Sequence, residues 1–259
     1  MLKYNFENSL DFLGSDRVLS SIKKNEKMLE QLFLEKTEDK EQVFGWFNVE
    51  KWTTPELVFK MKEKAKEIQE KADIFVLVGV GGSNNGARSI IKALEKQTKV
   101  EIIYAGNNLS SNAVCRLLEK LKGKSVYINV IAKNFETLEP GLSFRILRRF
   151  MWEQYGDNIS ERVIVTGTLG SQLNKLANEN DYLFLPFPED IGGRYSVLSP
   201  VGLFPTAVAG IDIEEIIRGA HDMEQSLKNT SFRENPGVIY GVIRNLLEER
   251  GFAMEFLSS

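Results

Sequence analysis

The chain has 259 residues, of which 42% are hydrophobic and 27% charged, and its formal net charge is -3 at pH 7. This composition is ordinary for a globular protein, and the net charge together with the absence of a basic stripe in the sequence gives no reason to expect nucleic-acid binding. The sequence shows no apolar run of membrane-spanning length, no signal-peptide core after Met1 and only one cysteine. We therefore expect a cytoplasmic protein that contacts neither nucleic acid nor membrane.

Residues 1–72 have the apolar spacing of helices and precede every predicted strand. We expect them to form a helical extension. Within it, Gly45 and Trp46 begin a short aromatic segment, which we expect to dock the extension onto the rest of the protein. Thr54 followed by Pro55 predicts the start of a helix, because threonine caps helices well and proline suits their first position.

Residues 73–210 alternate between short apolar runs and amphipathic helices, which predicts a doubly wound α/β sheet. Ligands of such sheets bind at the carboxyl ends of the strands. The predicted strands cover residues 74–78, 100–105, 125–131, 162–166 and 182–185.

Residues 211–259 differ in character from the segment before them. We expect one helix after Asp212 and another after Asn235, with the run from Phe252 to Leu257 as a new strand. A strand without a following helix is expected to belong to an incomplete second unit, so that residues 211–259 represent a truncated second domain.

The first predicted strand runs directly into a glycine-rich loop, Gly79-Val80-Gly81-Gly82-Ser83, that precedes a predicted helix. Glycines let backbone N–H groups approach a ligand, and the N-terminus of a helix favours an anion, usually phosphate. The dinucleotide fingerprint fails because Asn84 stands at its third glycine, and Ala87-Arg88 breaks the Walker A pattern. A small phosphate ester is therefore the favoured ligand, and a tight turn without a ligand is the alternative.

Two residue types limit the chemistry further. The single cysteine, Cys115, lies among apolar residues and is expected to be a core thiol rather than a nucleophile. The single histidine, His221, is expected on the surface of a helix, and it excludes a histidine-rich metal site. We expect no metal and no cofactor.

The most specific segment is Asp190-Ile191-Gly192-Gly193-Arg194-Tyr195-Ser196. Its glycines allow close backbone approach, and Arg194 offers a planar set of donors that suits an oxyanion, with a structural ion pair as the alternative. This segment closely resembles the signature of the glucose-6-phosphate isomerase (phosphoglucose isomerase) family, and the loop from Gly79 to Arg88 resembles that family's first sugar-phosphate loop. The resemblance extends from about Gly45 onward. It implies the sugar isomerase (SIS) fold, a flavodoxin-like sheet of five parallel strands.

The resemblance also implies an activity: the aldose-ketose isomerisation of glucose 6-phosphate and fructose 6-phosphate in glycolysis and gluconeogenesis, through a cis-enediolate. By similarity, Gly193 and Arg194 match the element that stabilises the enediolate. The positions that match phosphate-binding loops are Gly82, Ser83, Lys133, Asn134 and Thr137.

This chain also departs from the family. Ala132 removes a hydroxyl donor from the second phosphate loop and Glu136 adds a negative charge there, which should weaken phosphate affinity. The catalytic glutamate, histidine and lysine of the family have no counterpart in matching context, and His221 does not lie in the family's histidine motif. We expect the N-terminal part of an isomerase that is inactive alone, in a homodimer or with a complementing C-terminal half. The alternatives are a non-catalytic sugar-phosphate-binding module and an association partner completed by another chain.

Overall fold

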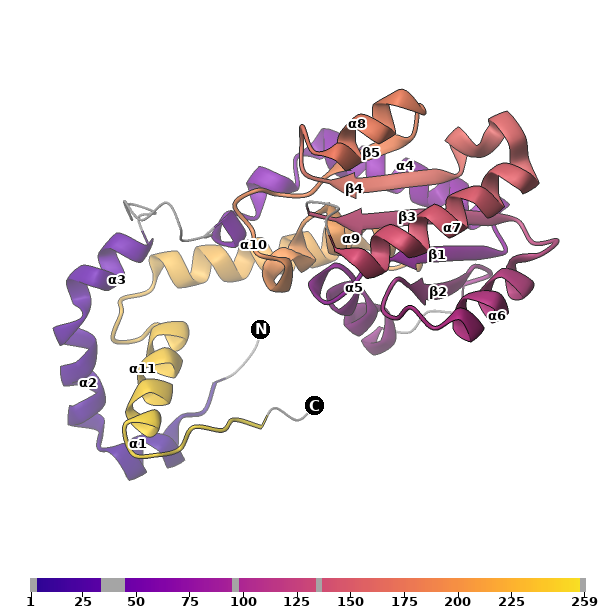
Figure 1. Ribbon diagram of the computed structural model, residues 1–259. Helices are drawn as coiled ribbons and strands as arrows, with labels where there is room; N and C mark the ends of the chain where they lie inside the picture. Colours follow the sequence, from indigo (N-terminus) through magenta and orange to yellow (C-terminus); the bar gives the residue numbers. More distant parts are fainter. Residues whose placement is uncertain (1–3, 34–44, 95–97, 134–136, 257–259) are drawn as a thin grey trace. The chain divides into compact units, whose positions relative to one another are not determined.

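The computed structural model describes residues 4–33, 45–94, 98–133 and 137–256. Its centre is a five-stranded parallel sheet with the strand order β2-β1-β3-β4-β5 (Figure 1). The strands are β1 (Ile74–Val78), β2 (Glu101–Ala105), β3 (Val126–Ala132), β4 (Val163–Gly167) and β5 (Leu183–Pro186). The predicted doubly wound α/β sheet is confirmed, and its strands begin and end within one residue of the predicted ones.

The central strands are buried on both faces, which explains why their sequences are continuous apolar runs. Every residue of β1, β3 and β4 is buried. The pairing is parallel and in register, so that Val78 lies opposite Ala105 on one side and Val130 on the other. The carboxyl ends of the strands therefore meet at one edge of the sheet, and the chain leaves β1 and β3 toward opposite faces. This divergence is the place where doubly wound sheets bind ligands.

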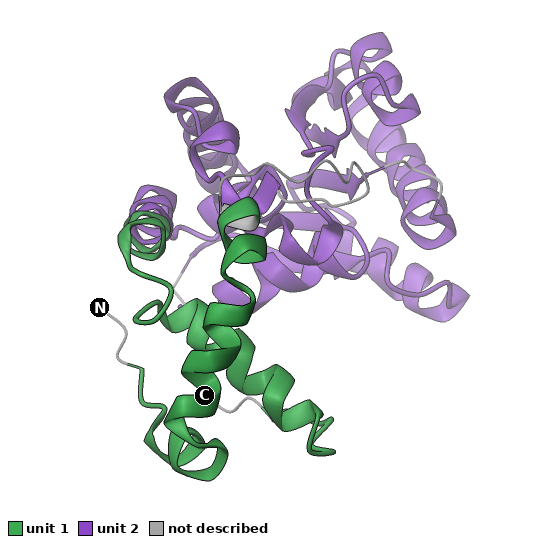
Figure 2. Ribbon diagram, turned by 90° about the vertical axis from the view of Figure 1, so that its left-hand side faces the viewer, with its two compact units in different colours: residues 1–42, 222–259 green, residues 43–221 purple. Residues whose placement is uncertain are grey.

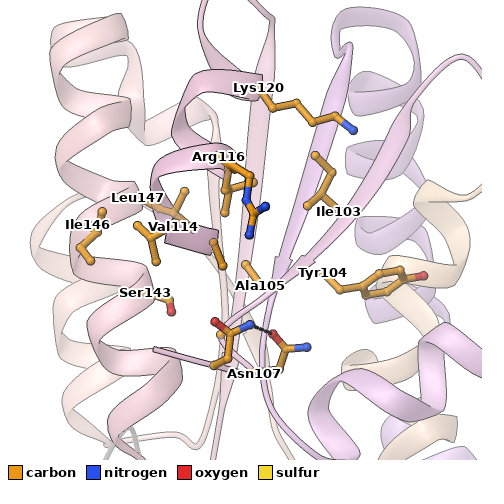
Figure 3. Close-up of a pocket in the computed structure, with 14 residues that line it drawn as sticks. Ile103, Tyr104, Ala105, Asn107, Val114, Arg116, Lys120, Ser143, Ile146 and Leu147 are labelled. Atoms are coloured by element: carbon orange, nitrogen blue, oxygen red, sulfur yellow. Dashed lines mark hydrogen bonds between the residues drawn. The ribbon is translucent and has the colours of Figure 1, made fainter. Parts of the chain in front are cut away.

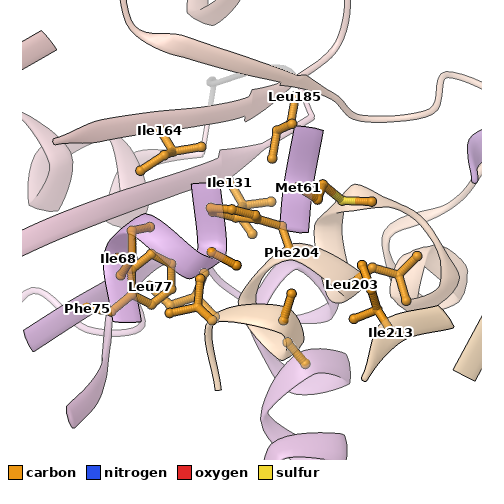
Figure 4. Close-up of a cluster of buried hydrophobic side chains, with 14 of the residues drawn as sticks. Met61, Ile68, Phe75, Leu77, Ile131, Ile164, Leu185, Leu203, Phe204 and Ile213 are labelled. Carbon is orange, nitrogen blue, oxygen red and sulfur yellow. The ribbon is translucent and has the colours of Figure 1, made fainter. Parts of the chain in front are cut away.

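One face of the sheet packs against α4, α5 and α9, and the other packs against α6, α7 and α8. Figure 4 shows the first of these cores, in which Phe204 of α9 lies between the strand residues and Met61 of α4. Thr54 caps α4 by accepting a hydrogen bond from the Leu57 amide at 3.4 Å, which confirms the predicted start of this helix. The helices are α4 (Pro55–Lys71), α5 (Gly82–Ala93), α6 (Ser111–Leu121), α7 (Leu138–Tyr155), α8 (Gln172–Glu179) and α9 (Pro200–Val208), and the 3-10 segments are η1 (Gly45–Phe47), η2 (Glu50–Trp52), η3 (Gly156–Glu161) and η4 (Gly193–Leu198).

By compactness the chain divides into two units, residues 43–221 and residues 1–42 together with 222–259 (Figure 2). The helix α10 (Ile213–Asn229) runs from the first unit into the second. The predicted segments 1–72, 73–210 and 211–259 follow from sequence pattern, whereas these units follow from compactness. The division into three functional domains stays a prediction.

The smaller unit has a hydrophobic core of its own. It consists of α1 (Glu7–Leu13), α2 (Ser15–Lys24), α3 (Glu26–Phe33) and α11 (Pro236–Glu248), and its buried side chains include Leu13, Val18, Ile22, Val242 and Leu246. Asn235 begins α11 as predicted: its side-chain oxygen accepts hydrogen bonds from the amides of Gly237 and Val238 at 3.0 and 3.2 Å. Arg17 and Glu249 form an ion pair at 3.0 Å in the same unit.

Two expectations are wrong. The strand predicted from Phe252 is not formed over the described residues 252–256, and Met254 and Phe256 are 81% and 88% exposed there. An apolar run becomes a strand only where a neighbouring strand offers hydrogen bonds, and no described strand lies beside this one. Cys115 is exposed rather than buried, because α6 turns its apolar stripe away from that position. Within the described ranges, no helix is long and apolar enough to cross a membrane.

Candidate functional site

The loop between β1 and α5 forms the first half of the candidate site. Gly81 has φ +59° and ψ -127°, a conformation that side chains other than hydrogen strongly disfavour. The amides of Asn84 and Asn85 donate to the Gly81 carbonyl at 3.1 and 2.8 Å, which begins α5 immediately after the turn. The first turn of α5 carries no acidic residue, so no side chain of that turn neutralises the positive end of the helix dipole.

The second half is the Gly193–Leu198 segment η4, which lies directly against the first turn of α5. A Cβ placed on Gly82 would lie 1.9 Å from the carbonyl oxygen of Gly193 and 2.8 Å from the amide nitrogen of Arg194. Real atoms do not approach so closely, so only glycine fits at position 82 with this backbone. The structure therefore brings together the two glycine motifs, which are more than 100 residues apart in the sequence.

The chain just before η4 is held by Lys133 at the end of β3. The Lys133 ammonium group donates hydrogen bonds to the carbonyl oxygens of Glu189 and Ile191, at 2.8 and 3.1 Å. The predicted phosphate-binding lysine is thus engaged with the backbone in this structure. Its position links the second loop of the site to the Gly193–Arg194 segment.

The aromatic segment before α4 holds the same region from the other side. The Gly45 amide donates to the Asp190 carbonyl at 2.8 Å, and the Lys51 ammonium pairs with the Asp190 carboxylate at 2.5 Å. Trp46 stacks on Tyr195 with ring centroids 5.5 Å apart and an interplanar angle of 20°. The aromatic segment therefore packs against the site segment itself, a target that the sequence did not indicate. Its expected role in docking the helical extension stays a prediction.

The side chains of Ser83 and Arg194 have no partners within the part of the chain that the structure describes. Arg194 is exposed and makes no ion pair or hydrogen bond there, so the structural ion pair considered above is not formed among these residues. The half-buried Ser83 keeps its hydroxyl group without a hydrogen bond to a described residue, while its amide donates to the Val80 carbonyl at 3.3 Å. Both groups are therefore available to a ligand.

The second phosphate loop is described only at its ends. Thr137 occupies the N-cap position of α7, is exposed and makes no capping hydrogen bond, which leaves its hydroxyl group free for a ligand at the helix N-terminus. Asn134 and Glu136 lie outside the described residues. The roles assigned to Lys133, Asn134 and Thr137 stay predictions.

In the sequence, Asn84 stands where the dinucleotide fingerprint would have its third glycine, and the structure shows what its side chain does. Asn84 is 2% exposed, its side-chain nitrogen lies 3.5 Å from the Gly79 carbonyl oxygen, and its Oδ1 atom has no hydrogen-bond partner among the described residues. Ser196 is a second missed residue, whose hydroxyl group donates to the Gly193 carbonyl at 2.8 Å. Both side chains contact the backbone of the site. Each lies within one of the two motifs described above, but the sequence does not show which backbone group it contacts.

Comparison with known proteins places this geometry in a family. A family model described as phosphoglucose isomerase matches residues 61–249. Glucose-6-phosphate isomerases from Caldanaerobacter subterraneus and Acetivibrio thermocellus are each 34% identical to the chain over 99% of its length. The chain spans only 59% and 60% of the lengths of these two curated relatives.

Solved structures agree on the fold. A hypothetical protein from Thermus thermophilus superposes with a TM-score of 0.75 at 22% identity, covering 90% of this chain and 55% of its own. A glucose-6-phosphate isomerase from Chlamydia trachomatis superposes with a TM-score of 0.61 at 20% identity, covering 73% of this chain and 36% of its own. Since the family model matches well over half of the residues, the chain belongs to the phosphoglucose isomerase family.

Proposed function

We propose that this chain provides the sugar-phosphate-binding part of a glucose-6-phosphate isomerase. The observation that carries the proposal is the backbone contact of Gly82 with Gly193 and Arg194, which places two unpartnered donor groups on adjoining segments. In this proposal Ser83 and the start of α5 hold the phosphate, with Lys133, Asn134 and Thr137 completing the clamp. The hexose phosphate is the partner of the site.

Arg194 and Gly193 have the catalytic role in this proposal. Isomerisation moves a proton between C1 and C2 of the open-chain sugar, so that negative charge develops on the oxygens of a cis-enediolate. A guanidinium group and backbone donors placed at those oxygens stabilise the charge, and they act most strongly where water is excluded. Arg194 supplies the positive charge, and the Gly193 backbone brings it beside the phosphate loop.

The proton transfer also needs a base, which the described site does not offer in a suitable form. The nearest carboxylate in the anchoring network, Asp190, is paired with Lys51 at 2.5 Å. His221 has its Nδ1 atom 3.5 Å from Glu50 Oε1, in a hollow formed by η2, α4 and α10. We therefore propose that the 259 residues alone bind the sugar phosphate without interconverting it, and that the base comes from a complementing half or a second subunit.

A non-catalytic sugar-phosphate-binding module is the second candidate. This candidate is favoured because the Ser83 and Arg194 side chains have no described partners, whereas the Asp190 carboxylate is paired with Lys51. Binding a sugar phosphate needs only hydrogen-bond donors and does not need a base. The two candidates differ in what happens when the remaining part of an isomerase is supplied: the first gains turnover and the second does not.

The test is calorimetry of the purified chain with fructose 6-phosphate, and with fructose as the ligand that lacks the phosphate. We expect binding of the phosphate ester only, weakened about tenfold or more by Ser83→Ala, since this change removes a charge-assisted hydrogen bond to the phosphate. Arg145→Gln, at an exposed arginine of α7, is the matched control and should change nothing. Equal heats for fructose and its phosphate would refute the phosphate site. Turnover by the isolated chain that disappears in Arg194→Gln would refute the need for another half.

A further inference from the structure

A pocket of about 280 Å³ lies over the edge strand β2, between α6 and α7 (Figure 3). It is separate from the groups assigned to the sugar phosphate above. Its lining is mainly apolar and includes Ile103, Ala105, Val114, Leu117, Ile146 and Leu147. An apolar surface of this kind favours the hydrophobic body of a ligand.

The charged residues that line the pocket are all basic. No residue that lines it is acidic, and two are basic, Arg116 and Lys120. The Lys120 ammonium group is occupied by the Glu101 carboxylate, whereas Arg116 has no ion pair or hydrogen bond with any described residue. Figure 3 shows the Arg116 guanidinium group directed over the pocket. An unpaired guanidinium beside an apolar surface is a site for an oxyanion.

A second, independent observation comes from the opposite wall. Ser143 of α7 is only 7% exposed, and its hydroxyl group makes no hydrogen bond with a described residue. Since Ser143 lines the pocket and its hydroxyl group has no described partner, this group is available to an occupant. In Figure 3 Ser143 faces the space between α6 and α7. A neighbouring amide is also available, because Asn107 accepts a hydrogen bond from Asn108 at 3.3 Å through its oxygen and keeps its own NH₂ group free.

From these contacts we propose that the pocket binds a small amphipathic anion, namely a carboxylate on a compact aromatic or branched aliphatic body. The carboxylate pairs with Arg116 and accepts from the Ser143 or Asn107 donors, and the body packs on the apolar residues of β2, α6 and α7. The volume lies just below the range of pockets for drug-sized molecules, which limits the occupant to a smaller one. A free sugar phosphate is disfavoured because most of its hydroxyl groups would face apolar walls.

The pocket shares a wall with the phosphate loop. The Gly79 amide donates to the carbonyl of Ala105 at 3.0 Å, and Gly106 (φ +85°) is so close that a Cβ there would lie 3.2 Å from the Gly79 nitrogen and 3.3 Å from the Pro140 Cα. An occupant that moves the end of β2 therefore displaces the start of the first phosphate loop and the first turn of α7, which follows the second loop. Interiors this closely packed transmit such displacements.

The experiment is a titration of the 259-residue chain with 2-naphthoate, followed by saturation-transfer NMR, with 2-naphthamide as the neutral ligand of the same shape. We expect saturable binding with a Kd of about 1 mM for a ligand of this size, and at least fivefold weaker binding of the amide. No saturation by about 20 mM, or equal affinity for the amide, would overturn the proposal.

Variants locate the site. Arg116→Gln should weaken naphthoate binding about fivefold or more, because it removes the charge of the ion pair, and Val114→Phe should abolish binding by filling the pocket. Arg145→Gln, at an exposed arginine of α7 that does not line this pocket, should have no effect. Arg116 is exposed, so its replacement leaves the fold intact and the test remains valid even if Val114→Phe does not fold. Unchanged affinity in Arg116→Gln would show that the ligand binds elsewhere and would overturn the assignment.

Discussion

The carbonyl oxygen of Gly193 lies 1.9 Å from the point that a Cβ on Gly82 would occupy. This contact joins the first turn of α5 to η4 and allows the phosphate loop and the Arg194 segment to act on one ligand. Since both partners are backbone, the contact cannot be relieved by the rotation of a side chain.

We predict that Gly82→Ala lowers the free energy of unfolding by about 1 to 3 kcal/mol and removes fructose 6-phosphate binding, because the added methyl group forces the two segments apart. Chemical denaturation and calorimetry measure the two effects. Gly219→Ala is the control: this helical position has no heavy atom within 4 Å of the new methyl group, and the change should stabilise by about 0.5 to 1 kcal/mol. Unaltered binding in Gly82→Ala would show that the two motifs need not touch.

A second prediction concerns Lys133. If it fastens the chain before η4, Lys133→Met loses two hydrogen bonds from a charged donor and destabilises the ligand-free protein by about 1.5 to 3 kcal/mol. Amide hydrogen exchange at Ile191 and Gly193 should become faster. Lys92→Met, at an exposed lysine of α5, should leave both measurements unchanged. Loss of phosphate binding with unaltered stability and exchange would instead assign Lys133 to the ligand alone.

Glu67 is expected to make the protein sensitive to acid. Burial alone would raise the pKa of its carboxyl group, but hydrogen bonds from Lys64 and Tyr127, at 2.8 and 3.0 Å, hold the pKa below its usual value of 4.5. A lowered pKa in the folded state contributes stability above the unfolded pKa, and the contribution is lost as pH falls through the folded pKa. Glu67→Gln should therefore reduce the urea midpoint at pH 7 and have little effect at pH 3. An equal reduction at both pH values would contradict the pairing.

Tyr127 is expected to show the opposite pH dependence. Burial, and then its hydrogen bond to Glu67, raise the pKa of the Tyr127 hydroxyl group from 10.0 to about 12. Because the folded state holds this proton more tightly, stability is complete below pH 10 and falls as pH rises from 10 to 12. The decline should be shallower in Tyr127→Phe, whereas the exposed Tyr195→Phe should follow the unaltered protein. Parallel curves for all three proteins would exclude this cause.

The sheet could be predicted because its cause is local. The run from Ile74 to Val78 is apolar throughout, and the glycines after it end the strand. The apolar composition and the following glycines together determine strand β1. The candidate site could be predicted for a related reason. Gly82 and Gly193 each lie in a short sequence motif, and each motif indicates an anion-binding role by itself. The structure adds that the two glycines are in contact.

The remaining features depend on neighbours that a sequence does not display. Lys133 has a long side chain, and only the folded chain shows that its ammonium group reaches the carbonyls of Glu189 and Ile191. The exposure of Cys115 depends on how α6 is rotated about its axis, which a few apolar neighbours do not determine. The run after Phe252 has strand composition but lacks a described strand to pair with, so its propensity alone was misleading.

The core shared by α2 and α11 has a consequence for the order of events during synthesis. Arg17 and Glu249, paired in this unit, are 232 positions apart, so α1, α2 and α3 leave the ribosome long before their partner helix exists. At about 5 to 20 residues per second the delay is roughly 10 to 50 s, ample for a sheet domain to fold. We expect the nascent chain to complete the sheet first, while the apolar stripe of α2 waits uncovered and available to chaperones.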